Sequence, residues 1–146
     1  PPPVLYNTPG NHPVSLSVIG NNGCNATDTE TIRVYANPLV DFDVISLCEG
    51  DTASFTDLTT VSSGENITSH FWDFGDGETS TLANPDHLYQ STGSFDISLT
   101  VTTTHCWGSD TITLPVEPSP IASISQDLTS GCSPLNVQFT NNSTDA

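Results

Sequence analysis

The stretch His70-Phe71-Trp72-Asp73-Phe74-Gly75-Asp76-Gly77 determines the fold of this chain. Its aromatic first half favours a β-strand, and Trp72 is expected to place a large side chain at the centre of a core. The glycines on either side of Asp76 predict a tight turn, because glycine adopts positive φ at little steric cost. The stretch therefore predicts a strand that runs directly into a tight turn and carries a tryptophan into the interior.

Residues on both sides of this stretch alternate between apolar and polar side chains, most clearly from Phe95 to Val101. Such alternation buries one face of each strand and leaves the other in water, as in an antiparallel sandwich. No window has helical periodicity. We predict an all-β, immunoglobulin-like antiparallel β-sandwich with about seven short strands in about 80 residues. The other alternating segments are residues 40–44, 53–55, 71–74 and 112–116.

The sequence also repeats itself at an interval of 82 to 84 residues. The matched blocks are 5–10 with 88–93, 14–18 with 97–101, 24 with 106, 28–29 with 110–111, 34–38 with 116–120, 48 with 132, and 55–56 with 139–140. We expect head-to-tail repeats: residues 1–37 form the C-terminal part of a first repeat, 38–119 a complete repeat, and 120–146 the N-terminal part of a third. This phase predicts a segment of a longer array, with proline-containing joints that limit bending.

Charge excludes several classes of partner. The 146 residues include 17 acidic residues and one basic residue, Arg33, and the formal net charge is −16. Nucleic-acid binding depends on Lys and Arg contacts to phosphate, so we expect no nucleic-acid partner. No apolar stretch approaches the ~20 residues of a membrane-spanning helix, so we expect no membrane insertion.

The titratable residues form no pattern typical of a catalytic site, so we expect no enzymatic activity. The four histidines have no zinc-ligand spacing, and no nucleophile motif accompanies the serines. Calcium is the better metal candidate, since hard cations prefer carboxylate oxygens. The alternative is that Asp76 caps the turn and the other aspartates solvate the strands. The carboxylates considered for calcium are Asp41, Asp43, Asp73 and Asp76.

The cysteines follow the repeat: Cys24 matches Cys106, and Cys48 matches Cys132. Two cysteines per copy in an acidic, lysine-free β-chain indicate an oxidising, extracellular setting. The expected topology places Cys48 and Cys106 at opposite ends of a sandwich, whereas a disulfide requires Cα atoms within about 7 Å. We expect cross-links between successive copies or neighbouring chains, with an intradomain bond and free thiols as open alternatives.

These motifs resemble a known family. The stretch ending at Gly77, followed by Asn84-Pro85-Asp86-His87-Leu88-Tyr89 and then Gly93-Ser94-Phe95-Asp96-Ile97, closely resembles the polycystic-kidney-disease (PKD) domain. The resemblance covers the whole middle copy. It implies an immunoglobulin-like fold in which Tyr89 is placed like a corner tyrosine that ties a loop to the backbone. It also implies that calcium near the Gly75–Gly77 turn is worth testing, because some PKD domains bind it there.

The resemblance implies two functions. Tandem PKD repeats resemble the stalks or filaments of large cell-surface adhesins of Bacteroidota, exported by the type IX pathway and used in attachment, gliding or prey contact, where identical chains would bundle. Alternatively, PKD domains accompany secreted proteases and polysaccharide-degrading enzymes as substrate-binding modules. The second function requires exposed aromatic residues on one sheet, for which Phe71, Trp107 and Tyr35 are the candidates and Trp107 the strongest.

Two threonines are candidates for modification. Asp51-Thr52-Ala53 and Asp110-Thr111-Ile112 resemble the sites that such bacteria O-glycosylate in exported proteins. Thr52 and Thr111 are therefore predicted acceptors. The alternative is that such short patterns arise by chance in a Thr-rich chain.

Overall fold

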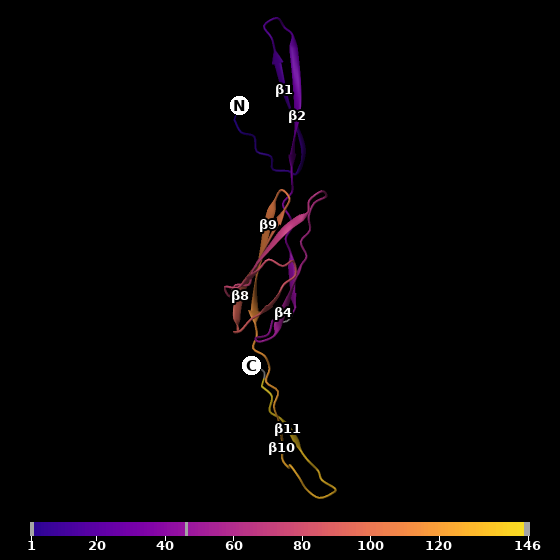
Figure 1. The fold of residues 1–146 in the computed structure, drawn as a ribbon, viewed down its shortest axis with the longest axis vertical. Helices are drawn as coiled ribbons and strands as arrows, with labels where there is room; N and C mark the ends of the chain where they lie inside the picture. Colours follow the sequence, from indigo (N-terminus) through magenta and orange to yellow (C-terminus); the bar gives the residue numbers. More distant parts are fainter. Residues whose placement is uncertain (1, 46, 145–146) are drawn as a thin grey trace.

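The computed structural model describes residues 2–45 and 47–144, drawn out along one axis (Figure 1). A hairpin of β1 (Gly10–Ile19) and β2 (Asn25–Val34) lies at one end. A hairpin of β10 (Ile124–Gln126) and β11 (Phe139–Asn141) lies at the other, and a seven-stranded unit lies between them. In the described ranges, no helix is long and apolar enough to cross a membrane.

The middle unit is a sandwich of two antiparallel sheets. The three-stranded sheet has the order β3 (Phe42–Ile45), β4 (Thr52–Asp57), β7 (Asp86–Leu88). The four-stranded sheet has the order β6 (Thr79–Ser80), β5 (Ile67–Asp73), β8 (Gly93–Thr103), β9 (Trp107–Val116). The predicted all-β, immunoglobulin-like sandwich is therefore confirmed.

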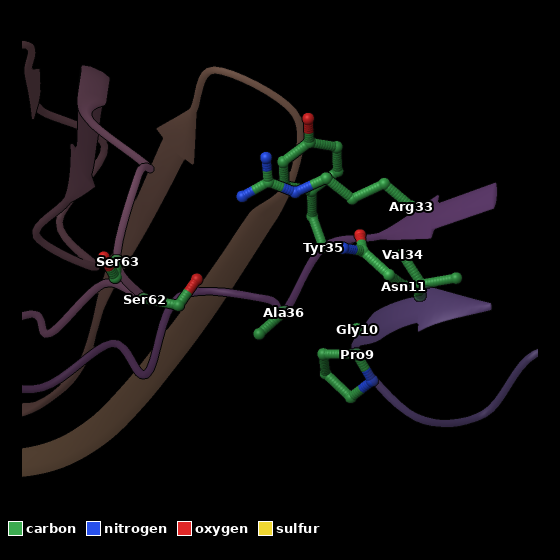
Figure 2. A pocket seen from close by; sticks show the side chains of 9 residues that line it. All are labelled: Pro9, Gly10, Asn11, Arg33, Val34, Tyr35, Ala36, Ser62 and Ser63. Carbon is green, nitrogen blue, oxygen red and sulfur yellow. The ribbon is translucent and has the colours of Figure 1, made fainter. Parts of the chain in front are cut away.

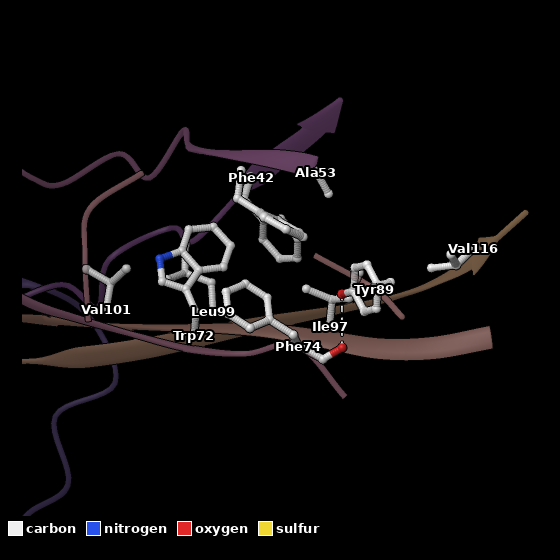
Figure 3. Packing of buried hydrophobic residues seen from close by; sticks show 10 residues of the cluster. Phe42, Ala53, Trp72, Phe74, Tyr89, Ile97, Leu99, Val101 and Val116 are labelled. Carbon is white, nitrogen blue, oxygen red and sulfur yellow. Dashed lines mark hydrogen bonds between the residues drawn. The ribbon is translucent and has the colours of Figure 1, made fainter. Parts of the chain in front are cut away.

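The core lies between these two sheets (Figure 3). On β8 the inward residues Ile97, Leu99 and Val101 are fully buried, as their alternation predicted. Trp72 is also fully buried, and Phe42 from the opposite sheet meets it edge-on with ring centroids 5.2 Å apart. Burial of an aliphatic side chain of this size contributes about 1.5–3 kcal/mol to folding, so the β8 face and the tryptophan contribute substantially to stability.

The turn after β5 needs its glycines. Gly75 and Gly77 have φ of 81° and 98°, as the sequence predicted. A Cβ added at Gly75 would lie 2.7 Å from the Asp96 carbonyl oxygen, so only glycine fits there. The Tyr89 hydroxyl donates a 3.0 Å hydrogen bond to the Phe74 carbonyl oxygen, which confirms its predicted corner position. Burial, with nearby carboxylates, raises the pKa of Tyr89 and keeps this hydroxyl a donor.

The two flanking hairpins repeat pairings found in the middle unit. Gly10 pairs with Val34 in β1–β2, as Gly93 pairs with Val116 in β8–β9. The loops that join these strand pairs are closed by equivalent hydrogen bonds. The Gly20 N–H donates to the Cys24 carbonyl oxygen, and the Thr103 N–H donates to the Cys106 carbonyl oxygen. The first hairpin thus has the pairing of the last two strands of the sandwich.

The second flanking hairpin matches the start of the sandwich. Ile124 pairs with Asn141, as Phe42 pairs with Asp57. An isolated bridge between residues 121 and 144 corresponds to the bridge between residues 39 and 60. These shared registers agree with the sequence repeat.

The flanking hairpins take no part in the core. Every described member of the core cluster lies between residues 40 and 116. Val14, Leu16 and Val18 of β1 are 45%, 67% and 53% exposed, although their counterparts on β8 are fully buried. The apolar face of β1 is therefore open in this structure.

Three features differ from the strands expected from the sequence. Strands β6 and β7 have two and three residues, too few to give an alternation signal. Strand β9 begins at Trp107 rather than at Ile112, because its first inward positions are Gly108 and Asp110 and carry no apolar side chain. Gly108 fits closely there: a Cβ added to it would lie 2.9 Å from the Pro38 carbonyl oxygen.

Candidate binding face

Two aromatic side chains share the outer face of the four-stranded sheet. Phe71 on β5 pairs with Thr100 on β8, and Thr102 on β8 pairs with Trp107 on β9. Residues paired across a sheet, and residues two apart on one strand, point to the same face. Since Leu99 and Val101 point into the core, Phe71, Thr100, Thr102 and Trp107 point outward.

The aromatic pair forms an open platform. Phe71 is 46% exposed and Trp107 is 65% exposed. Strands ~4.8 Å apart and a rise of ~3.3 Å per residue place their Cα atoms roughly 12 Å apart. The positions between and beside them carry the hydroxyl residues Ser69, Thr100, Thr102 and Ser109, and Asp73 lies on the same face, two positions after Phe71 on β5. The face therefore combines two apolar rings with hydroxyl groups and a carboxylate.

Tyr35 does not belong to this face. It lies after β2, where its ring stacks on His105 with centroids 3.7 Å apart. Of the three aromatic candidates from the sequence, the structure therefore brings two together and places the third at the junction of the first hairpin and the middle unit. Trp107, the strongest of the candidates from the sequence, is the more exposed of the two rings. Its cross-strand neighbour Thr102 was not identified from the sequence.

Three histidines pair with carboxylates, a feature that the sequence did not reveal. The side-chain distances are 2.8 Å for His70–Asp57, 2.7 Å for His87–Asp76 and 2.8 Å for His105–Glu65. The partners are 11 to 40 residues apart in the sequence, so no local spacing would have found them. In a chain without lysine, these imidazoles act as the hydrogen-bonding partners of carboxylates, of which Glu65 is buried.

The aspartates considered for calcium each have a local structural role. Asp41 and Asp43 accept hydrogen bonds from the backbone N–H of the next residue. Asp73 accepts one from the Gly75 N–H, and Asp76 accepts one from the Glu78 N–H. Among the described residues, no group of three or more His, Cys, Asp or Glu side chains is arranged to hold a metal. Calcium binding by any of the four carboxylates therefore stays a prediction.

Asp76 is engaged through both of its oxygens, because its second oxygen contacts His87. Burial opposes its ionisation, but the hydrogen bonds from the Glu78 N–H and His87 outweigh burial and lower the pKa of Asp76 below its ordinary value. His87 itself is buried and stacks on Phe74 with ring centroids 4.0 Å apart. This carboxylate thus fixes the turn and the histidine behind it.

The four cysteines are unpaired in this structure. Cys48 bridges to Glu117, just after β9, whereas Cys106 directly precedes β9. The ten residues of β9 span about 33 Å at ~3.3 Å per residue. The geometry therefore rules out a Cys48–Cys106 bond within one unit, while Cys24 and Cys132 are exposed in the flanking hairpins.

Both predicted glycosylation acceptors are accessible. Thr52 begins β4 and is exposed, and Thr111 is exposed on β9. Thr111 lies in the same sheet as the aromatic pair, opposite Ser98. Their modification stays a prediction.

The chain belongs to the PKD domain family, whose model matches residues 35–116, more than half of the chain. Residues of the chain are 50% identical over 74 positions to the pre-pro-metalloprotease PrtV of Vibrio cholerae, which covers 51% of this chain and 7% of that protein. They are 42% identical over 53 positions to a microbial collagenase of Vibrio alginolyticus, which covers 36% of this chain and 6% of that protein. The chain thus spans less than a tenth of these curated relatives.

A solved PKD structure agrees with the family assignment. The PKD1 domain of Vibrio anguillarum Epp superposes with a TM-score of 0.54 at 26% identity. The match covers 59% of this chain and all of that domain. This supports a complete PKD domain as the unit present in the middle of the chain.

Proposed function

We propose that this chain is a non-catalytic substrate-binding module of a secreted protein, and that it binds an extended polymer through Phe71 and Trp107. The single observation that supports this most is the position of both aromatic side chains on one exposed sheet face. The two curated relatives described above are a metalloprotease and a collagenase. An extracellular location is part of this proposal.

A collagen-like fibre is the substrate that we favour. Collagen chains adopt a polyproline II-like helix with 3 residues per turn and ~3.1 Å rise. One turn is therefore ~9 Å long, comparable with the roughly 12 Å between the two aromatic positions. Proline rings in such helices pack on aromatic side chains, and the threonine hydroxyls at positions 100 and 102 would hydrogen-bond to the exposed backbone carbonyls.

Co-sedimentation with insoluble polymers tests this proposal. The full chain is mixed separately with fibrillar collagen, cellulose and chitin, and the bound fraction is measured. We expect binding to collagen that weakens in Phe71→Ala and in Trp107→Ala. Phe139→Ala is the matched control, because Phe139 is 65% exposed but lies on β11, away from the face. Binding to none of the polymers, or equal losses in the control, would overturn the proposal.

A second candidate function is mechanical: the chain is a spacer in the stalk or filament of a large bacterial surface adhesin. The repeated strand registers of the flanking hairpins favour it, as does the placement of the two ends at opposite poles of the middle unit. In this function, neighbouring repeats of the same chain are the partners, identical chains form bundles, and cysteines cross-link successive copies. Export by the type IX pathway and O-glycosylation at Thr52 and Thr111 belong to the same proposal.

A non-reducing disulfide map of the parent protein tests the spacer function. Bonds between a Cys48-type residue of one copy and a Cys106-type residue of the next would support it, because these positions lie at opposite ends of a unit. Free thiols in the parent protein would remove this support. Calcium binding at Asp41, Asp43, Asp73 or Asp76 stays a prediction.

A further inference from the structure

The first hairpin contacts the middle unit through a stack of three side chains. The Tyr35 ring lies parallel to His105, with 3.7 Å between centroids and 5° between planes. The Arg33 guanidinium lies over the Tyr35 ring, 4.8 Å from its centroid (Figure 2). A cation over an aromatic ring contributes about 0.5–1 kcal/mol at an exposed site, so Arg33, the only Lys or Arg of the chain, reinforces this contact.

The middle unit holds His105 in place for this stack. The imidazole Nδ1 lies 2.8 Å from Glu65 Oε1, and the His105 backbone N–H donates to Glu65 Oε2 at 3.3 Å. The Glu65 side chain is only 1% exposed. Burial opposes its ionisation, but the hydrogen bonds from Thr103 and His105 outweigh burial and lower the pKa of Glu65. The ring that receives Tyr35 is therefore preorganised by a buried carboxylate.

The Arg33 side chain also reaches the loop before β5. A Cβ added at Gly64 would lie 3.5 Å from Arg33 Nη2, so the guanidinium lies beside this glycine. A pocket next to the stack is lined by Pro9 and Asn11 of the first hairpin and by Ser62 and Ser63 of the middle unit (Figure 2). The stack and the approach of Arg33 to Gly64 are thus both contacts of this junction, and the pocket lies beside them.

The other junction is built differently. By the repeat, Pro115 and Glu117 take the places of Arg33 and Tyr35. Glu117 exchanges backbone hydrogen bonds with Leu47 and Glu49, and the Ser119 hydroxyl donates to the Glu49 carbonyl oxygen at 2.7 Å. The aromatic stack is therefore a property of the first junction and not of the repeat in general.

We propose that Arg33-Val34-Tyr35 is a docking segment for the surface formed by His105 and Glu65, and that their stack fixes the orientation of the first hairpin on the middle unit. This proposal is independent of polymer binding. It makes the angle between successive units depend on which residues occupy these positions. A junction with tyrosine and histidine at these positions is stiff, and one with either residue replaced by alanine is loose.

Residual dipolar couplings on the full chain test this directly. In the wild type and in Tyr35→Phe, which retains the ring, we expect the β2 and β9 amides to fit one alignment tensor. In Tyr35→Ala and in His105→Ala, we expect at least a twofold reduction of the couplings of β2 relative to those of β9. The double variant should lose no more than either single variant, because both remove the same contact. Glu117→Ala, at the other junction, is the matched control and should leave the β2 couplings unchanged.

Cross-strand NOEs between Ser15 and Thr29 report whether the hairpin itself is formed in each variant. If Tyr35→Ala disrupts the hairpin, the couplings of His105→Ala are the test of the proposal, because His105 lies outside the hairpin. NOEs between the rings of Tyr35 and His105 should be present in the wild type. Averaged β2 couplings in the wild type, or unchanged couplings in His105→Ala, would overturn the proposal.

Discussion

Phe71 and Trp107 lie on one exposed face of the four-stranded sheet, separated by the threonines of β8. Neither residue is a member of the core cluster, which lies on the inward side of the sheet. Both rings are free to contact a partner, because each is about half exposed or more. The residues to which we assign polymer binding therefore lie on the opposite face of this sheet from the core.

The two turn glycines should respond unequally to alanine. We expect Gly75→Ala to lower the free energy of unfolding by about 3 kcal/mol or more, because a Cβ would collide with the Asp96 carbonyl in addition to requiring positive φ. Gly77→Ala should cost about 1–2 kcal/mol, because it requires positive φ but meets no atom within 4 Å. Urea unfolding of both variants measures the difference. Equal losses would contradict the close approach to Asp96.

Tyr89→Phe isolates one buried hydrogen bond. The change leaves the Phe74 carbonyl without its side-chain donor, which should cost about 1–2 kcal/mol of unfolding free energy. Tyr35→Phe is the control, since Tyr35 contributes through its ring face and should lose almost nothing. Thermal and urea unfolding measure both. A Tyr89→Phe variant as stable as the wild type would show that the corner hydrogen bond contributes nothing.

Acid should destabilise the middle unit through Asp76 and Glu65. Both have pKa values lowered in the folded state, from ordinary values of 3.8 and 4.5. Their stabilisation is therefore fully present above those ordinary values and is lost as the pH falls through the lower folded values. We expect the melting temperature to fall below about pH 4.5.

The variants Asp76→Asn and Glu65→Gln should be less stable at pH 7 and should lose less on acidification. Melting temperatures between pH 7 and pH 2 measure both effects. The same acid loss in these variants as in the wild type would assign the acid sensitivity to other carboxylates.

Oxidation should not join Cys48 to Cys106 within one molecule. About 33 Å of β9 separates the two ends where these cysteines lie, far beyond the 7 Å that a disulfide allows. A non-reducing peptide map of the oxidised monomer should lack this bond. Its presence in a monomer that retains the native β-sheet signal would contradict the described topology.

Much of the fold could be predicted from particular residues. The alternation from Phe95 to Val101 gave the central strand, and the glycines around Asp76 gave the turn, because both patterns act locally. The short strands β6 and β7 could not be predicted, since Thr79 and Ser80, for example, become a strand only by pairing with β5.

The site was less accessible to sequence reasoning. Phe71 and Trp107 could be selected as candidates, but their common face depends on the registers of β5 and β9 with β8. Tyr35 was also an aromatic candidate for the binding face, but it lies elsewhere. Its ring stacks on His105, which is 70 positions away in the sequence. Such long-range pairings depend on tertiary structure and leave no local pattern.

The affinity for immobilised collagen, measured by surface plasmon resonance on the full chain, tests the central claim most directly. We expect Phe71→Ala and Trp107→Ala each to raise Kd about fivefold to tenfold, as loss of about 1–1.4 kcal/mol requires. The double variant should raise Kd about 25-fold to 100-fold, because the two residues are far enough apart for their effects to add, while Phe139→Ala keeps the wild-type Kd. Wild-type affinity in the double variant would contradict a binding role for this face.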